Sequence, residues 1–372
     1  MNGRDCDERE LAAWLRLLES PGVGREAARR LLAAFGSPQA VLAASTDDRR
    51  QFVSAASATA LARPGERHET LLAETRAWLQ ADERHRLITL GDPDYPAALL
   101  ETADPPLMLH AWGRPELLQR SALAIVGSRN ATVQGRENAR AFAAHLGGAG
   151  LTIVSGLALG IDAAAHEGAL GTPGGTIAVV ATGLDQTYPR RHAALARRIA
   201  DQGLVLSEYA LGMPPLREHF PQRNRIIAGI TRGTLVVEAT LQSGSLITAR
   251  LAVEAGRDVF AMPGSIHAPQ AKGCHALIKQ GAKLVETAQD VLEELGLRAP
   301  ATRAAASAPA ADEPARPNPI LDALGHDPIG LDELVARTGW SAAELNARLL
   351  ELELAGQVER LPGQRFQRLA RG

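Results

Sequence analysis

The chain has 372 residues, more than a single hydrophobic core normally organises, so we expect two or three domains. A hydrophobic content of 45% and a charged content of 22% are typical of a globular protein, and the formal net charge of −2 excludes attachment to nucleic acid through charge spread over the whole surface. Aromatic residues make up only 3%, so any binding by ring stacking must depend on a few side chains.

The cysteine pattern and the apolar runs indicate the cellular compartment of the protein. Cys6 and Cys274 are far apart and neither belongs to a Cys-x-x-Cys pair, which predicts neither a disulfide framework nor a zinc site. The first residues are polar, and no apolar run reaches the length that spans a membrane. We therefore expect a cytoplasmic protein without a membrane span.

Residues 1–83 are predicted to form a helical domain. Leucines and alanines recur at helical spacing on both sides of the turn Pro21–Gly24, a pattern typical of a helix-hairpin-helix or SAM-like domain. Such a turn can offer backbone amides to a DNA phosphate, with cationic side chains nearby from Arg25, Arg29 and Arg30. The alternative is a helical bundle whose glycines only allow the helices to pack closely.

Residues 84–297 alternate short apolar runs with amphipathic helical segments. The expected strands are ALAIVG from Ala122, then LTIVSG, TIAVVA, GLVLSE, TLVVEA, DVFAMPG and KLVE. Strands of this kind, buried on both faces, are required by a parallel sheet. The region is therefore predicted to be a Rossmann-like, doubly wound α/β domain, in which ligands bind beyond the carboxyl ends of the strands.

The turns that follow these strands carry small polar residues suited to anions. Glycine allows close approach of a ligand, and serine hydroxyls and free amides accept phosphate, so we expect a phosphate-binding edge formed by Gly127, Ser128, Arg129, Ser155, Gly156, Ser243, Gly244 and Ser245. There is neither a GxGxxG fingerprint with its acidic partner nor a GxxxxGK[ST] loop. The sequence thus predicts no cofactor and no nucleotide-hydrolysing apparatus.

The segment 218–227, EHFPQRNRII, is predicted to be a loop that leads into an apolar helix. Phe220 can stack on a base, Arg223 and Arg225 can bind phosphates, and Asn224 can reach a base edge, which together favour single-stranded nucleic acid. In the alternative interpretation Phe220 fills the core and the arginines form ion pairs with two acidic residues, Glu208 and Glu238. Arginines outnumber acids between Tyr188 and Arg232, whereas the chain after Glu286 is more acidic.

Asp162 and His166 stand four residues apart on one predicted helix face. They could form an acid/base or metal pair, but two residues without a third ligand more often provide a helix cap and a buried hydrogen bond. The second interpretation is the one we expect, with no metal site.

The C-terminal part is predicted to contain a flexible linker, residues 298–318, and a winged-helix domain, residues 319–372. The helix that would enter a DNA groove carries Glu344, Glu351 and Glu353 against Asn346 and Arg348. Because acidic side chains are repelled by phosphates, we hypothesise that this domain contacts protein or its own chain in preference to duplex DNA.

The strings IVGSR, SGLALGIDAAAH, FPQRNRIIAG, VVEATLQSGSLITARLAVEAGRDVFAMPG and KGCHALIKQGA occur in an order and spacing that resemble the DprA/Smf family over residues 93–291. The resemblance implies a non-enzymatic protein that binds single-stranded DNA, protects it and helps load the RecA recombinase during natural transformation, as a homodimer. Carried over residue by residue, it implies DNA contacts at Gly127, Ser128, Arg129, Phe220, Arg223 and Asn224, and weaker ones at Ser155, Gly156, Ser243 and Gly244.

The main alternative is a nucleotide-processing enzyme of the lysine-decarboxylase-like Rossmann group, because Glu238 lies at a predicted strand end. Those enzymes carry a PGGxGTxxE motif, whereas here Glu238 precedes the Ser-Gly-Ser turn. The order of glutamate and glycines therefore disfavours that chemistry.

Overall fold

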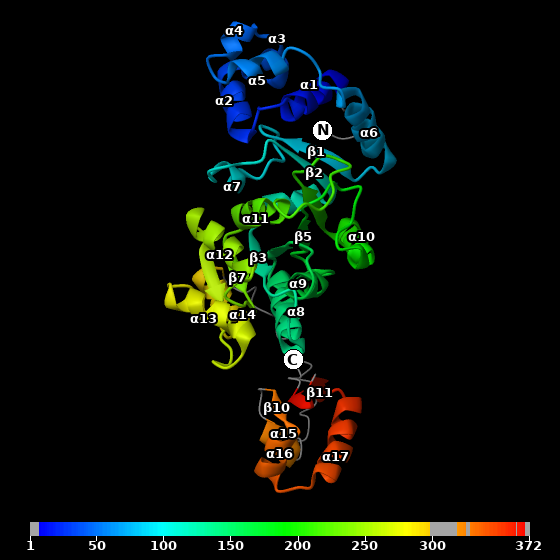
Figure 1. Cartoon of the computed structure of the whole chain (residues 1–372), viewed down its shortest axis with the longest axis vertical. Coiled ribbons are helices and arrows are strands. Elements are labelled where there is room, and N and C mark those ends of the chain that lie inside the picture. Colours follow the sequence, from blue (N-terminus) through cyan, green and yellow to red (C-terminus); the bar gives the residue numbers. More distant parts are fainter. Residues whose placement is uncertain (1–6, 298–317, 325–327, 362, 369–372) are drawn as a thin grey trace. The chain divides into compact units, whose positions relative to one another are not determined.

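A computed structural model describes residues 7–297, 318–324, 328–361 and 363–368 (Figure 1). Contacts separate two compact units, one within Met1–Ala131 and Gly135–Leu297, the other within Arg298–Gly372 together with Thr132–Gln134. The predicted helical and α/β domains thus share the first unit. The predicted linker lies, apart from Asn318, outside the described residues, and the domain boundaries stay predictions.

The helical region begins the first unit and confirms a helical domain with a hairpin. Its helices are α1 (Glu8–Glu19), α2 (Arg25–Phe35), α3 (Pro38–Ala43), α4 (Thr46–Arg49), α5 (Ala55–Ala60) and α6 (His68–Ala81). The turn between α1 and α2 needs glycine, because Gly22 has a φ of 75°, in the left-handed region that other residues rarely adopt. Trp14 and Leu61 are among the buried side chains that join these helices in one core.

A nine-stranded sheet follows in the described part of this unit, in the order β1-β2-β6-β5-β4-β3-β7-β8-β9 (Figure 1). The strands are β1 (His85–Thr89), β2 (Met108–Gly113), β3 (Ala122–Val126), β4 (Thr152–Ser155), β5 (Thr176–Val179), β6 (Leu204–Ser207), β7 (Gly233–Val236), β8 (Asp258–Ala261) and β9 (Lys283–Leu284). The seven neighbouring strands β6, β5, β4, β3, β7, β8 and β9 all pair in parallel, which confirms the doubly wound fold.

Helices cover both faces of the parallel strands. They are α7 (Ala97–Leu100), α8 (Val133–Gly148), α9 (Ile161–Ala169), α10 (Ala193–Gln202), α11 (His219–Gly229), α12 (Ser245–Glu254), α13 (Lys272–Lys279) and α14 (Ala288–Glu294), with short 3₁₀ turns η1 (Pro115–Gln119), η2 (Arg190–His192) and η3 (Pro269–Ala271). Along β3, Ala124 packs in the core with α11 and α12, whereas Leu123 and Ile125 pack in the core with α8 and α9. Burial on both faces explains why the strands are continuous apolar runs.

Two sequence-based assignments are incomplete or wrong. The segment that contains Phe220 is not a loop before a helix but the first turns of α11 itself. Pro221 sits in the first turn, where an amide has no intrahelical acceptor, so the proline does not interrupt the helix. In addition, β1 and β2 extend the sheet by antiparallel pairing, and the sequence did not indicate them.

The second unit is a winged helix, as predicted. It contains α15 (Pro319–Leu324), β10 (Ile329–Gly330), α16 (Leu331–Thr338), α17 (Ala342–Leu354), β11 (Val358–Leu361) and β12 (Arg365–Arg368). Gly339 ends α16 in the left-handed conformation, and Ser341 and Glu344 form a capping box that starts α17. No helix among the residues described here is long and apolar enough to cross a membrane.

We expect Phe260→Ala to lower the free energy of unfolding by about 3 to 5 kcal/mol, because the fully buried Phe260 ring fills the core between β8 and the α8–α9 layer. Urea denaturation of the full chain measures this. Val253→Ala is the matched control, since Val253 is 65% exposed and its change should stay within about 0.5 kcal/mol. Equal effects of the two substitutions would contradict the described core.

Candidate functional site

The direction of strand order reverses between β3 and β7, and this position is the switch point of the sheet. In such sheets ligands bind at the carboxyl ends of the strands beside the switch point. The two loops are joined there, because the Ser128 amide donates a hydrogen bond of 2.7 Å to the Glu238 carbonyl. A Cβ on Gly127 would lie 2.6 Å from Cγ1 of Ile161 and 2.8 Å from the Glu238 carbonyl oxygen. Only glycine therefore fits at this turn, in which Ser128 is buried and Arg129 is exposed.

Arg129 is exposed and lies over the ring of Phe220, with its guanidinium carbon 5.3 Å from the ring centroid. On α11 the Phe220 side chain is half-buried and also contacts Tyr188, whose ring centroid is 5.7 Å away at an interplanar angle of 58°. Arg129, Phe220 and Tyr188 thus form a row of one cation and two rings, which joins the loops after β3 and β5 to the start of α11.

Arg223, one turn along α11, is only 4% exposed, and its buried Nε has no hydrogen-bond partner among the described residues. Its Nη1 lies so close to Gly156 that a Cβ there would be 1.5 Å away. Burial lowers the pKa of Arg223 to about 10, although Asp162 opposes this shift and favours the charged form. The site therefore holds a desolvated cation directly behind the turn that follows β4.

Asp162, at the start of α9, holds that turn in place. Its Oδ2 accepts hydrogen bonds from the amides of Gly156 at 3.1 Å and Ala158 at 3.3 Å. Burial raises the pKa of Asp162, whereas the Arg223 charge and the two amide donors act in the opposite direction. Asp162 is therefore not the helix cap that the sequence favoured, because α9 begins after Gly160 without a side-chain cap, and its carboxylate binds the preceding turn instead.

His166 completes the support of the same turn. Leu157, with a φ of 56°, adopts the left-handed conformation that is strained for a side chain of its size. The Leu157 amide donates to His166 Nε2 at 3.3 Å, so Nδ1 carries the proton and donates to Thr176 Oγ1 at 2.7 Å. The Thr176 hydroxyl then donates to the Ile153 carbonyl at 2.7 Å, which closes a buried chain of hydrogen bonds.

Ser155 faces the interior. Its side chain is fully buried and its hydroxyl donates a hydrogen bond of 2.7 Å to the Ile125 carbonyl, which ties β4 to β3. The hydroxyl is therefore used inside the sheet, and we leave Ser155 out of the surface proposed below.

The turn after β7 lies beside α11. Asn224 Nδ2 is 3.5 Å from the Gly244 carbonyl oxygen, and the hydroxyls of Ser243 and Ser245 are 2.7 Å apart. Gly244 is exposed, whereas Ser245 is buried at the start of α12. Asn224, Ser243 and Gly244 thus form a polar rim, the second group of candidate contacts beside the row of Arg129, Phe220 and Tyr188.

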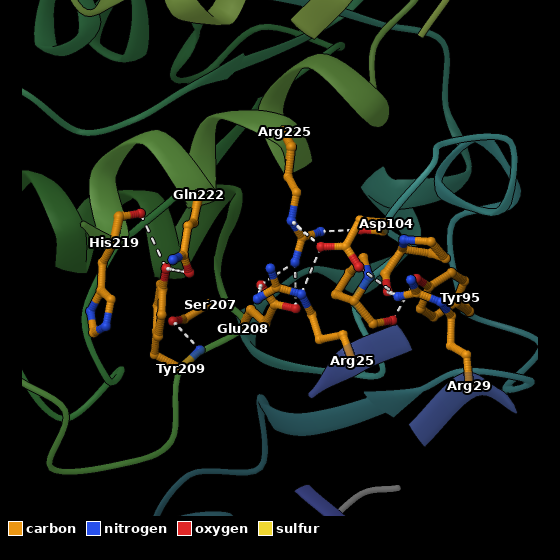
Figure 2. A network of polar contacts seen from close by, with 12 residues as sticks. Arg25, Arg29, Tyr95, Asp104, Ser207, Glu208, Tyr209, His219, Gln222 and Arg225 are labelled. Atoms are coloured by element: carbon orange, nitrogen blue, oxygen red, sulfur yellow. Dashed lines mark hydrogen bonds and ion pairs between the residues drawn. The ribbon is translucent and has the colours of Figure 1, made fainter. Parts of the chain in front are cut away.

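Arg225 points away from this rim, into a network of ion pairs (Figure 2). Its guanidinium donates to Glu208 Oε1 at 2.6 Å and to the Asp104 carbonyl at 2.6 Å. This is the ion pair with Glu208 that the alternative interpretation of the segment anticipated. Because Arg225 is engaged within the protein, we also leave it out of the proposed surface.

The hairpin arginines join the same network (Figure 2). Arg25 Nε lies 2.7 Å from Asp104 Oδ2, and Arg29 Nη1 lies 2.6 Å from Asp104 Oδ1. These two cations hold the start of α2 against the α/β region, and only Arg30, among the three arginines near the hairpin, is exposed. The contacts agree with the interpretation of the hairpin as a packing element.

Glu238, the residue on which the enzyme alternative depends, packs against α8. A Cβ on Gly135 would lie 2.3 Å from the Glu238 carboxyl carbon, so the glycine makes room for this side chain. The glutamate is half-buried at the switch point and not displayed on a free strand end.

Sequence reasoning missed Tyr188, which is 44% exposed beside Phe220. A single ring in a loop has no periodic pattern to reveal it. The available signal was its neighbours, because Arg190 and Arg191 follow it directly and are both exposed.

A switch-point edge that combines an outward arginine, a buried guanidinium and two rings defines a Rossmann-type protein with a basic, ring-bearing edge. Three family models match: DNA recombination-mediator protein A at residues 86–296, the DprA winged helix domain at 303–364, and the DprA-like N-terminal HHH domain at 8–52. The chain belongs to the DprA/Smf family of DNA-processing proteins.

Relatives and solved structures agree with this assignment. The chain is 44% identical to Protein Smf of Escherichia coli over 77% of this chain and 78% of that protein, and 51% identical to DNA processing protein DprA of Streptococcus pneumoniae over 55% and 72%. The structure of Streptococcus pneumoniae DprA superposes with a TM-score of 0.67 at 38% identity, covering 76% of this chain and 97% of that one. A structure of Helicobacter pylori DprA, titled for its single-stranded-DNA binding mode, gives 0.52 at 32% identity over 56% and 95%.

We expect the stability of the chain to fall as the pH drops below about 6.5, in part because of His166. Burial lowers the pKa of His166 to about 3, so between these pH values the unfolded chain binds a proton that the folded chain does not. This histidine then contributes a loss of up to about 1.4 kcal/mol per pH unit. Urea denaturation at a series of pH values measures the slope.

His166→Gln should reduce the slope of unfolding free energy against pH by up to about 1.4 kcal/mol per pH unit, which corresponds to one proton. The other groups titrate alike in both chains. His145→Gln is the control, because His145 is exposed. An unchanged slope in His166→Gln would show that the imidazole is not held neutral inside the fold.

Proposed function

We propose that the chain binds single-stranded DNA on a switch-point surface formed by Arg129 and Phe220 together with Gly127, with the buried Gly156 and Arg223 directly beneath it. The observation that carries this proposal is Arg223, which is 4% exposed and whose buried Nε has no hydrogen-bond partner among the described residues. A desolvated charge without hydrogen bonds costs free energy, and a phosphate oxygen is the acceptor that an arginine matches best. Arg129, exposed in front of it, supplies a second cation.

Rings beside cations select unpaired strands. Base stacking on an aromatic side chain needs a base that is not already stacked in a duplex, and Phe220 lies next to Arg129 at this edge. A phosphate held at Arg129 and Arg223 and a base on Phe220 would therefore favour a single strand over a double helix. Asn224, with Ser243 and Gly244, would contact the strand from the second polar rim.

Family membership supports the wider role. The Helicobacter pylori relative is described as binding single-stranded DNA, and this chain covers 95% of that structure. We infer that the protein acts in the cytoplasm without catalysis, protects incoming DNA, and helps load RecA during natural transformation, as a homodimer. The winged helix is proposed to contact protein or its own chain, because Glu344, Glu351 and Glu353 would repel a duplex.

We expect Arg129→Ala to weaken binding of oligo-dT and to flatten its salt dependence. Removing one phosphate contact should reduce the slope of log affinity against log salt by about 0.7, the value for one counterion on a single strand. Fluorescence anisotropy of the full chain over a range of salt concentrations measures this.

Arg63→Ala, an exposed arginine in the helical region, is the matched control and should leave the slope unchanged. Phe220→Ala should instead cost about 1 to 3 kcal/mol of binding free energy with no change of slope, because it removes stacking and not charge. An Arg129→Ala slope equal to that of the unaltered chain argues against phosphate binding at this surface.

The enzyme alternative makes a separate expectation. Incubation with nucleoside monophosphates should give no hydrolysis, since Glu238 is packed against α8. Chromatography of the products measures it. Turnover that Glu238→Gln abolishes would favour the nucleotide-processing enzyme over the binding protein.

A further inference from the structure

Tyr188 is the one exposed aromatic side chain among the described residues. All phenylalanines, tyrosines and tryptophans of the chain lie in the described part, and Tyr188, 44% exposed, is the only one among them that is neither buried nor half-buried. The other two tyrosines, Tyr95 and Tyr209, are buried, and their hydroxyls donate to the carbonyls of Pro106 at 2.7 Å and His219 at 3.1 Å. No described residue accepts a hydrogen bond from the Tyr188 hydroxyl.

The packing of the fold does not account for this ring. Tyr188 contacts Phe220 at a centroid distance of 5.7 Å and a tilt of 58°, a geometry in which the two rings do not cover each other's faces. Phe220 is half-buried and lies under the guanidinium of Arg129. Of the two rings in the row, Tyr188 therefore offers the larger free surface, in a chain that has few aromatic residues.

The surroundings of Tyr188 are those of a nucleotide subsite. Arg190 and Arg191 follow it and are exposed, and neither forms an ion pair with any residue that the structure describes. His192 holds this short segment against the turn after β4, because its Nδ1 lies 2.9 Å from the Leu157 carbonyl oxygen. An exposed ring and two free cations are thus fixed to the same turn that carries Gly156.

We propose that Tyr188 is a second base-stacking residue, which binds a nucleobase of the unpaired strand next to the base on Phe220. This inference rests on the proposed function and adds to it a subsite outside the set of residues carried over from the family. Arg190 and Arg191 bind the phosphates that flank that base. The row from Arg129 to Tyr188 then sets the direction of the strand, from the end of β3 toward the end of β5.

The test compares two ligands of equal charge: a labelled oligo-dT and an abasic strand with the same number of phosphates. Anisotropy titrations use the full chain and its variants Tyr188→Ala, Tyr188→Phe and Leu100→Ala. Tyr188→Ala should weaken oligo-dT binding on the order of 5- to 150-fold, the range of one lost base stack, and leave abasic binding and the salt slope unchanged. Tyr188→Phe keeps the ring and should bind within about twofold of the unaltered chain.

Leu100→Ala controls for the loss of an exposed apolar side chain away from this edge, since Leu100 is 57% exposed on α7. Thermal unfolding confirms that each variant is folded. Tyr188→Ala with unchanged oligo-dT affinity, or with an equal loss on both ligands, overturns the stacking role while the proposed function stands. An unaltered chain that binds neither ligand overturns the proposed function as well.

Discussion

The buried guanidinium of Arg223 is the constraint on which the switch-point edge depends. It occupies the space that a side chain at position 156 would need, so the turn after β4 must carry glycine there. Asp162 faces the same charge and binds the amides of that turn, so one carboxylate both offsets the cation and shapes the backbone. A single carboxylate offsets a buried cation only in part when no hydrogen bond joins them. The fold thus keeps an unsatisfied donor behind an open edge, and this links its packing to anion binding.

Helix α11 connects this edge to the helical region. One side of the helix presents Phe220 and Arg223 to the switch point, and another side carries Arg225 into the network with Glu208 and Asp104 (Figure 2). Because Arg25 reaches both carboxylates and Arg29 reaches Asp104, the hairpin is attached to the helix that carries Phe220. These groups are largely shielded from solvent, so salt screens their attraction less than it screens the exposed arginines of the edge. Conditions that weaken DNA contacts should therefore leave the helical region in place.

The sequence predicted the parallel strands well, because a continuous apolar run such as that around Ile125 is typical of a strand buried on both faces of a parallel sheet. It also placed the turns at Gly127, Gly156 and Gly244 on one edge. It did not distinguish buried from exposed arginines, because Arg129, Arg223 and Arg225 have the same chemistry. Only the positions of the last two around α11 decide that Arg223 is buried and that Arg225 forms ion pairs. Pro221 made the start of α11 look like a loop, since a proline interrupts a helix everywhere except near its start. Antiparallel β1 carries His85 and Arg86, and β2 carries His110 and Trp112, so these strands lack the uniform apolar run of their parallel neighbours.

The near-zero net charge conceals a division of charge between parts of the chain. The edge after β3 and β5 displays arginines without acidic partners, whereas α17, the helix that enters DNA in many winged helices, displays Glu351 and Glu353 beside the exposed side chains of Leu350 and Leu354. Arg348, the cation on that helix, already pairs with Glu351 at 3.0 Å. A phosphate approaching α17 meets repulsion and apolar surface, while one approaching the switch point meets unpaired guanidiniums. The proposed surface for nucleic acid therefore lies in the first unit, and contact with protein by the second unit stays a prediction that its exposed leucines favour.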